Sequence, residues 1–270
     1  MNEPDIVAER VRIVIDESVW SAQELAGRKY GVSPHIHHMD FMYGFMVHHA
    51  KTTKDAVDNY FGSGDRLAKA FAAVINECGF DFTRETRILD FASGYGRVTR
   101  HLQKYFVRSK IVASDVHEGA CRFNEQLLGV QAQQSNRNPA TTNLLGSYDA
   151  ICAMSFFTHM PEETFGPWLA RLWGALAPGG ILMFSTRGPH RLIDEQRLPE
   201  YEQCLRDGHV YWPQSEQYDL DLLDYGAATV TPSYVAKQLK LYTWAESTSR
   251  VENGWDSVQD LYIVKRSSDG

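Results

Sequence analysis

The sequence has no excess of basic residues, no paired cysteines and no apolar run long enough to span a bilayer. Its 27 lysines and arginines are outnumbered by 34 acidic residues, which gives a net charge of −7. Without a basic excess a protein gains little from counterion release, so a nucleic acid is not expected as the main partner. The four cysteines are scattered and form no C-x-x-C pair, as is typical of a reduced intracellular protein.

The first ten residues, MNEPDIVAER, are charged and lack the apolar segment of a secretory signal. Together with the lack of a membrane-spanning run, this predicts a soluble, cytoplasmic protein that does not bind a membrane. The sequence shows no internal repeat and no low-complexity tract. A length of 270 residues with 43% hydrophobic residues suits one sizeable domain with an elaboration, or two small domains.

From residue 87 onward, strand-like and helix-like segments alternate. Short apolar runs predict strands at 87–93, 110–115, 130–135, 148–157 and 181–186, and helical spacing occurs at 97–106, 117–128 and 161–176. This alternation is typical of βαβ units with a parallel sheet covered on both faces. A predicted helix at 231–239 is followed by strand runs at 239–248 and 258–266, joined by a turn-rich stretch at 250–256. Two consecutive strands pair as a hairpin, so one of them is antiparallel to the rest.

Two segments lie outside this alternation. Residues 1–80 are mainly helical by pattern and are predicted to form an N-terminal cap, which leaves 81–270 as the α/β domain. Within that domain, 187–230 is a polar, aromatic and irregular connection at the carboxyl end of a predicted strand. Open α/β sheets bind ligands at this edge. We therefore expect 187–230 to be an insertion on the substrate side.

The stretch 87–102, RILDFASGYGRVTRHL, lacks the third glycine of a dinucleotide-binding fingerprint. Gly94 and Gly96 permit close approach of the backbone to a ligand. Thr99, however, stands where a pyrophosphate site needs glycine for close packing of helix and strand. Asp115 ends the next predicted strand, where a carboxylate can accept ribose hydroxyls. A phosphate-free cofactor with an ammonium group would gain from Asp90, so an NAD-dependent dehydrogenase is the least favoured interpretation.

Four blocks, ILDFASGYGRVTRHL, IVASDV, the segment from YDAICAMSFFTHMPEE to STRG, and VQDLYIVKR, together resemble class I S-adenosylmethionine-dependent methyltransferases. The resemblance is to the bacterial small-molecule and glycan branch, and it covers roughly residues 58–266. It implies a Rossmann-like seven-stranded sheet with an antiparallel last strand, and S-adenosyl-L-methionine as the cofactor. The chain departs from the family pattern twice, because Ala92 replaces the usual first glycine and Asn136 replaces the usual acidic residue.

The resemblance also implies roles for individual residues. The glycine loop would hold the methionine portion of the cofactor, Asp115 the ribose and Val116 the adenine, and residues after the third and fourth strands would contact the adenine amine and the sulfonium. A predicted aromatic residue and glycine turn over the cofactor add Tyr60 and Gly62, although a helix cap at Ser63 or Asp65 would also explain that stretch. Arg97 is a candidate for the cofactor carboxylate. The full predicted cofactor set is Asp90, Ala92, Ser93, Gly94, Gly96, Asp115, Val116, Ser135, Asn136, Met154, Ser155, Tyr60 and Gly62.

Several methylation chemistries lack their residues here. No N-P-P-Y segment for adenine or glutamine methylation, no Pro-Cys pair for cytosine C5 and no acidic residue for magnesium follow the fourth predicted strand. A hydroxyl acceptor needs a base, and His159, just past that strand, is the predicted general base. The alternative for His159 is a local capping or packing role. The predicted activity is methyl transfer to an oxygen of a small molecule or glycan; the alternatives are N-methylation of an amine or amino-sugar, or a non-catalytic protein that binds S-adenosylmethionine.

Histidines cluster in HIHHMDFMYGFMVHH at 35–49, but their spacing does not suit a metal site. We expect no metal there, and interpret the segment as an aromatic and histidine helix that lines the acceptor pocket or a contact between subunits, as in a homodimer. In the insertion, aromatic rings are predicted either to stack on a sugar or aromatic acceptor or to form a small core. These are Tyr211, Trp212, Tyr218 and Tyr225.

Overall fold

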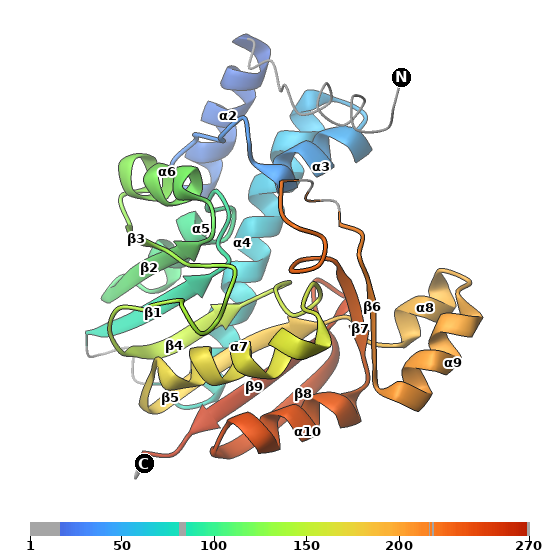
Figure 1. The fold of residues 1–270 in the computed structure, drawn as a ribbon. Helices are drawn as coiled ribbons and strands as arrows, with labels where there is room; N and C mark the ends of the chain where they lie inside the picture. Colours follow the sequence, from blue (N-terminus) through green and yellow to red (C-terminus); the bar gives the residue numbers. More distant parts are fainter. Residues whose placement is uncertain (1–16, 81–84, 216, 218, 269–270) are drawn as a thin grey trace. The chain divides into compact units, whose positions relative to one another are not determined.

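The computed structural model describes residues 17–80, 85–215, 217 and 219–268. These residues include a seven-stranded sheet in the order β3-β2-β1-β4-β5-β9-β8 and a separate pair, β6-β7 (Figure 1). The sheet with its antiparallel end confirms the predicted Rossmann-like class. The chain divides into two compact units, residues 1–86 with 93–134, and residues 87–92 with 135–270. The boundary predicted at residue 80 stays a prediction.

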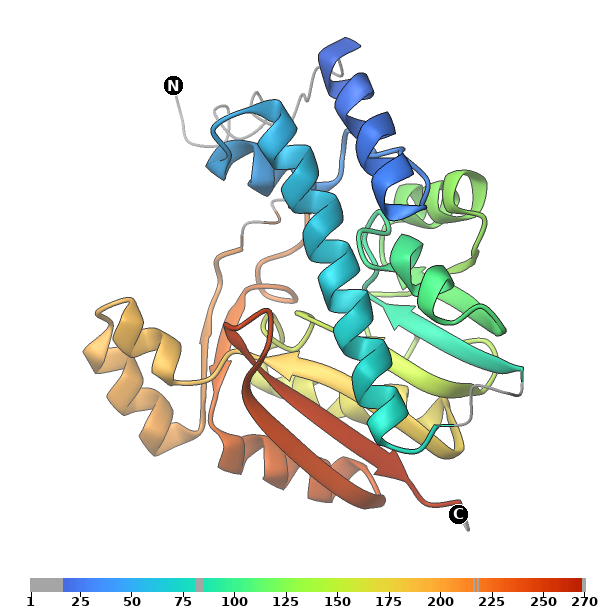
Figure 2. The same cartoon turned by 180° about the vertical axis from the view of Figure 1, so that it is seen from behind.

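The first unit opens with three described helices, α2 (Glu17–Tyr30), α3 (Phe41–His49) and α4 (Thr53–Glu77). This confirms the helical character predicted for the described part of the N-terminal segment. The side chains of Asp40 and Thr52 accept backbone N–H groups in the first turns of α3 and α4, which are otherwise without a helical partner. Figure 2 shows α2 beside the long helix α4, against which it packs.

Helix α4 continues through Gly62 and Gly64 without a break. The predicted glycine turn and the alternative cap at Ser63 or Asp65 are therefore both wrong. The helix persists because it buries an apolar stripe, which outweighs the low helix propensity of glycine. Gly64 serves close packing instead, since a Cβ atom there would lie 2.2 Å from the carbonyl oxygen of Arg97.

The first unit is completed by α5 (Thr99–Tyr105), β2 (Ser109–Asp115), α6 (Glu118–Leu128) and β3 (Gln131–Gln134). Strands β2 and β3 pair in parallel, as predicted. Gly129 ends α6 with φ +67°, the left-handed conformation that commonly terminates a helix. The connection from β2 to α6 lies at the carboxyl end of β2.

The second unit contains strands β4 (Tyr148–Ala153) and β5 (Leu176–Thr186), and all but the first residue of β1 (Thr86–Phe91). Strand β4 pairs in parallel with β1 and β5. Strand β9 (Gln259–Arg266) runs antiparallel to both β5 and β8 (Ala245–Trp255), as the predicted hairpin requires. Helices α7 (Glu162–Gly174) and α10 (Pro232–Tyr242) pack on each other, and both face the viewer in Figure 1.

Four predicted boundaries in this unit are wrong. Strand β4 ends at Ala153 and not at 157, because the chain enters a left-handed turn at Ser155 (φ +55°). Strand β5 begins at 176 and not at 181, and residues 239–242 belong to α10 and not to a strand. The hairpin turn lies at 256–258 and not at 250–256, because Asp256 and Ser257 both have positive φ and reverse the chain between Trp255 and Gln259.

The insertion is more regular than predicted. It contains α8 (His190–Asp194), α9 (Leu198–Asp207), β6 (His209–Trp212) and β7 (Ala227–Val230), the two strands being antiparallel. A small core of Leu192, Cys204 and Val210, with Trp212 against it, explains this order. Tyr218 lies outside the described residues. In the described part of the chain, no helix is both long enough and apolar enough to cross a bilayer.

Candidate functional site

The two glycines of the loop after β1 serve different purposes. Both have positive φ, +53° at Gly94 and +77° at Gly96. A Cβ atom at Gly96 would lie 2.2 Å from Leu128 Cδ1 and 2.4 Å from Asn124 Oδ1, so this glycine lets the loop pack on α6. At Gly94 no heavy atom lies within 4 Å of the Cβ position, which leaves the backbone open to close approach. Ser93 fixes the start of the loop by donating its backbone N–H to the carbonyl of Ser114 at 3.0 Å.

Asp115 connects the end of β2 to this loop. One oxygen, Oδ2, accepts the backbone N–H of Gly94 at 2.8 Å, and Oδ1 accepts the backbone N–H of His117 at 3.0 Å and contacts its ring Nδ1 at 2.8 Å. A carboxylate offers about four acceptor sites, so the buried group keeps capacity for a further donor such as a ribose hydroxyl. Val116 follows half-buried, its carbonyl accepting from Gln134 Nε2 at 2.9 Å.

Tyr60 and Gly62 lie on α4 and are not turn residues. Tyr60 is 0% exposed and its hydroxyl donates to Asp40 Oδ2 at 2.5 Å. Burial raises the pKa of Tyr60 well above its ordinary value. A Cβ atom at Gly62 would lie 3.1 Å from the Tyr30 hydroxyl. A side chain without exposed surface does not fit the predicted direct contact of Tyr60 with a cofactor, which is a correction to the sequence analysis.

The histidine-rich segment contributes to the same unit through His37. The predicted helix over 35–49 begins only at Phe41, and His37 precedes it. Its ring stacks on Tyr95, between the two loop glycines, with centroids 4.2 Å apart and planes 7° apart. Burial, with the neighbouring His38, lowers the pKa of His37 to about 4. Among the described residues, no three His, Cys, Asp or Glu side chains group closely enough to hold a metal ion.

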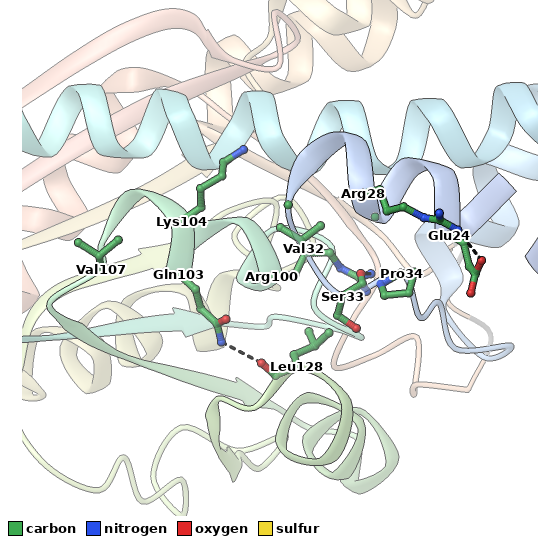
Figure 3. A pocket seen from close by; sticks show the side chains of 12 residues that line it. Glu24, Arg28, Val32, Ser33, Pro34, Arg100, Gln103, Lys104, Val107 and Leu128 are labelled. Atoms are coloured by element: carbon green, nitrogen blue, oxygen red, sulfur yellow. Dashed lines mark hydrogen bonds and ion pairs between the residues drawn. The ribbon is translucent and has the colours of Figure 1, made fainter. Parts of the chain in front are cut away.

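A groove of about 830 Å³ also occurs in the first unit, lined by α2, the segment after it, α5 and Leu128 (Figure 3). Its three cations already have partners, since Arg28 pairs with Glu24 at 2.9 Å, Lys104 pairs with Asp65, and Arg100 donates to the carbonyls of Ser33 and His35. We assign no ligand to this groove.

Arg97, a sequence candidate for a cofactor carboxylate, donates from Nη1 to the hydroxyl of Ser63 at 3.0 Å.

In the second unit, the carboxyl ends of β1 and β4 carry two strained residues. Ala92 and Ser155 are non-glycine residues with φ of +56° and +55°. They follow Asp90 and Cys152, which are opposite each other in the register of β1 and β4. Burial and the charge of Asp90 raise the pKa of the Cys152 thiol well above its ordinary value. Left-handed non-glycine residues cluster at binding and active sites, so this sheet edge is a candidate site on backbone grounds.

A ring of hydrogen bonds holds Ser155 in place. Its backbone N–H donates to Ser185 Oγ at 2.7 Å, and the Ser185 hydroxyl donates to Gln259 Oε1 at 2.6 Å. The Gln259 side-chain amide donates from Nε2 to Ser155 Oγ at 3.1 Å, which closes the ring and joins the ends of β4, β5 and β9. Met154 lies half-buried beside this ring. Met154 and Ser155 were predicted as site residues from the sequence. Ser185 and Gln259, which hold Ser155, were not, because no local signal marks them.

Asn136, predicted at the adenine amine, is exposed and forms a local turn. Its backbone N–H donates to Thr142 Oγ1 at 3.1 Å and its side-chain oxygen accepts the N–H of Asn138 at 3.3 Å. Ser135 beside it is half-buried. The turn accounts for an asparagine at this position, because Asx turns favour that side chain.

His159 is held by the insertion. Its ring Nδ1 lies 2.7 Å from the carbonyl oxygen of Gly226, and its ring stacks on Tyr225 with centroids 4.2 Å apart. A carbonyl only accepts, so Nδ1 carries the proton and, in the neutral ring, the lone pair resides on Nε2. Helix α7 begins after Pro161 without a side-chain cap, so the alternative capping role of His159 is wrong, whereas its local packing on Tyr225 is confirmed.

Two of the aromatic side chains predicted to stack on an acceptor, Tyr211 and Trp212, have partners within the insertion. The Tyr211 hydroxyl donates to the carbonyl of Leu222 at 2.6 Å. The guanidinium carbon of Arg197 lies 4.1 Å from the centroid of the Trp212 ring. The alternative role as a small core is therefore the one for which the structure provides contacts.

Comparison with known proteins identifies a domain. Residues 89–182 match the family described as "Methyltransferase domain". The chain is 28% identical over 146 residues to the malonyl-[acyl-carrier protein] O-methyltransferase of Bacillus cereus. The matched region covers 51% of this chain and 50% of that protein. The chain thus spans about half the length of this curated relative.

Solved structures agree on the fold. The plantazolicin methyltransferase BpumL in complex with SAH has a TM-score of 0.52 at 15% identity, covering 97% of this chain and 99% of that one. An O-methyltransferase family protein from Burkholderia thailandensis has a TM-score of 0.53 at 15% identity, covering 84% of this chain and 63% of the other. At this identity the likeness shows a shared fold.

Proposed function

We propose that this chain, which belongs to the class I S-adenosylmethionine-dependent methyltransferases, transfers the methyl group of S-adenosyl-L-methionine to an oxygen of a small molecule or glycan. The observation that carries the proposal is the loop after β1 with its partner Asp115. Gly94 leaves the backbone open, and its N–H is already bonded to the Asp115 carboxylate at 2.8 Å. This arrangement, within residues matching a methyltransferase domain, suits a ribose-containing cofactor without a pyrophosphate.

The proposed cofactor residues form two sets, one in each unit. The first unit contributes Ser93, Gly94, Gly96, Asp115 and Val116. The second contributes Asp90, Ala92, Ser135, Asn136, Met154 and Ser155. The sulfonium of the cofactor supplies an already activated methyl group, so the chain's own work is to bind, align and exclude water.

His159 is the proposed general base. With Nδ1 protonated and bonded to Gly226, the Nε2 lone pair is the site that would accept the proton of an acceptor hydroxyl. An oxygen acceptor is supported by the names of the curated relative and of one solved structure, both O-methyltransferases. A nitrogen acceptor would need no such base, which makes His159 the residue that separates the two chemistries.

The cofactor is tested by quenching of the six tryptophans with S-adenosylhomocysteine, with NADH as the comparison. We expect binding of the first and not of the second. Asp115→Ala should weaken binding by about 1–3 kcal/mol, the usual cost of orphaned hydrogen-bond partners. Unchanged affinity in Asp115→Ala would contradict the ribose assignment.

The acceptor chemistry is tested with methyl-labelled S-adenosylmethionine and panels of hydroxyl and amine acceptors. His159→Ala should lower turnover at least about tenfold on a hydroxyl acceptor while affinity for S-adenosylhomocysteine is unchanged. His190→Ala, in the insertion, is the matched control and should retain turnover. Equal turnover of His159→Ala and wild type would rule out the base, and binding without any transfer would favour a non-catalytic protein.

A further inference from the structure

Arg100 is an almost completely buried arginine in α5, 2% exposed, and it bridges two segments of backbone. Its Nε donates to the carbonyl of Gly96 at 3.0 Å, and Nη2 donates to the carbonyl of Tyr95 at 3.3 Å. On the other side, Nη1 donates to the carbonyls of Ser33 at 3.1 Å and His35 at 2.7 Å. Figure 3 shows Arg100 beside Val32 and Ser33.

A buried carboxyl group and a phenol complete the surroundings of this guanidinium. Nη2 also donates to the Tyr60 hydroxyl at 3.4 Å, and that hydroxyl donates to Asp40 at 2.5 Å. Burial raises the pKa of Asp40, while Tyr60, the N–H of Tyr43 and the charge of Arg100 oppose the rise. Asp40 at the same time caps α3. One cluster therefore ties α3, α4 and α5 together.

The hydrogen bonds of Arg100 show what it does not do. A guanidinium has five N–H groups, and acceptors are present for all of them, namely Gly96, Tyr95, Ser33, His35 and Tyr60. No N–H is left for a bound anion. The side chain instead holds the segment 33–35 against the loop 95–96, next to the place where His37 stacks on Tyr95.

We propose that Arg100 is a positioning residue that sets the shape of the glycine loop, and thereby the affinity for the cofactor, with Tyr60 and Asp40 orienting its guanidinium. This inference rests on the proposed function, because the ligand of the loop is taken to be S-adenosylmethionine. It gives Tyr60 an indirect role, which agrees with its complete burial.

The test uses the full chain and S-adenosylhomocysteine as the probe, with titration calorimetry of folded variants. Arg100→Lys keeps a cation beside Asp40 but cannot span both backbone segments, since an ammonium lacks the planar fork. It should weaken binding at least about tenfold while circular dichroism stays native. Tyr60→Phe keeps the ring and removes the orienting hydroxyl, and should weaken binding about threefold or more.

Arg122→Lys is the matched control, because Arg122 is an exposed arginine of α6 paired with Glu118. It should bind the probe within about twofold of wild type. If Arg100→Lys is folded and binds like wild type, a purely structural or electrostatic role is sufficient and the proposal fails. If Arg100→Lys does not fold, the same decision rests on Tyr60→Phe. If wild type itself does not bind the probe, the proposed function fails instead.

Discussion

Replacing Ala92 by glycine tests whether the end of β1 stores backbone strain. Ala92 has φ +56°, a region that costs a non-glycine residue about 1–2 kcal/mol. Glycine removes that cost but loses about 0.5–1 kcal/mol through the greater freedom of its unfolded chain. The expected net change in the free energy of unfolding is therefore a gain of about 0–1.5 kcal/mol.

The informative quantity is the difference from the same substitution at an unstrained position. Ala132 lies in β3 and is half-buried like Ala92, so Ala132→Gly should lose about 0.5–1 kcal/mol. The two variants should then differ by about 1–2 kcal/mol, or a few degrees in melting temperature for a chain of this size. Urea denaturation monitored by tryptophan fluorescence measures both. Equal losses at the two positions would refute the claim that Ala92 is strained.

Two further predictions concern the loop and acid stability. Gly96→Ala should lower the free energy of unfolding by about 2–4 kcal/mol, because its Cβ would overlap Leu128 and Asn124. Gly94→Ala should lower it by only about 1 kcal/mol but should weaken binding of S-adenosylhomocysteine more than Gly96→Ala does. The reverse order in denaturation and binding titrations would contradict these roles. His101 is 0% exposed and burial lowers its pKa to about 3, against the partial opposition of Asp65. In the folded protein the His101 imidazole resists protonation, whereas in the unfolded chain it is protonated below about pH 6.5. The free energy of unfolding is therefore fully retained above about pH 6.5 and declines by about 1.4 kcal/mol per pH unit as the pH falls toward 3. Between pH 7 and pH 5, the free energy of unfolding should fall by about 2 kcal/mol less in His101→Gln than in wild type. An equal fall in the two proteins would contradict this prediction.

Local pattern predicted most strands because a strand buried on both faces needs a continuous apolar run. The runs at 87–93 and 110–115 became β1 and β2 with little change. Pattern failed where tertiary packing outweighed propensity. Gly62 and Gly64 suggest a turn, yet both lie in α4, whose apolar stripe is buried. Gly64 is needed there because a Cβ atom would overlap the carbonyl oxygen of Arg97. The insertion lacked clear periodicity because its helices α8 and α9 are short and its strands have only four residues each.

The same contrast between local pattern and tertiary packing applies to the predicted site residues. Gly94, Gly96 and Asp115 belong to a short segment whose geometry is largely local, and the structure places Gly94 against Asp115. The groups that orient such residues come from distant parts of the chain. Gln259 reaches Ser155 across 104 residues and Arg100 reaches Ser33 across 67, separations at which a single sequence has no signal.

The insertion shows why site and fold are not separable here. Backbone N–H groups of Gly226 and Ala228 donate to the carbonyls of His159 and Thr158 at 3.2 and 2.7 Å. His209 Nε2 lies 3.1 Å from the carbonyl of Met160, which extends the attachment along the same loop. The segment expected to contact the acceptor thus also fixes the ring nitrogen of the proposed base. A Cβ atom at Gly226 would lie 2.3 Å from the carbonyl oxygen of Trp212, so a substitution at Gly226 should displace this backbone and disturb the contact with His159 and the insertion together.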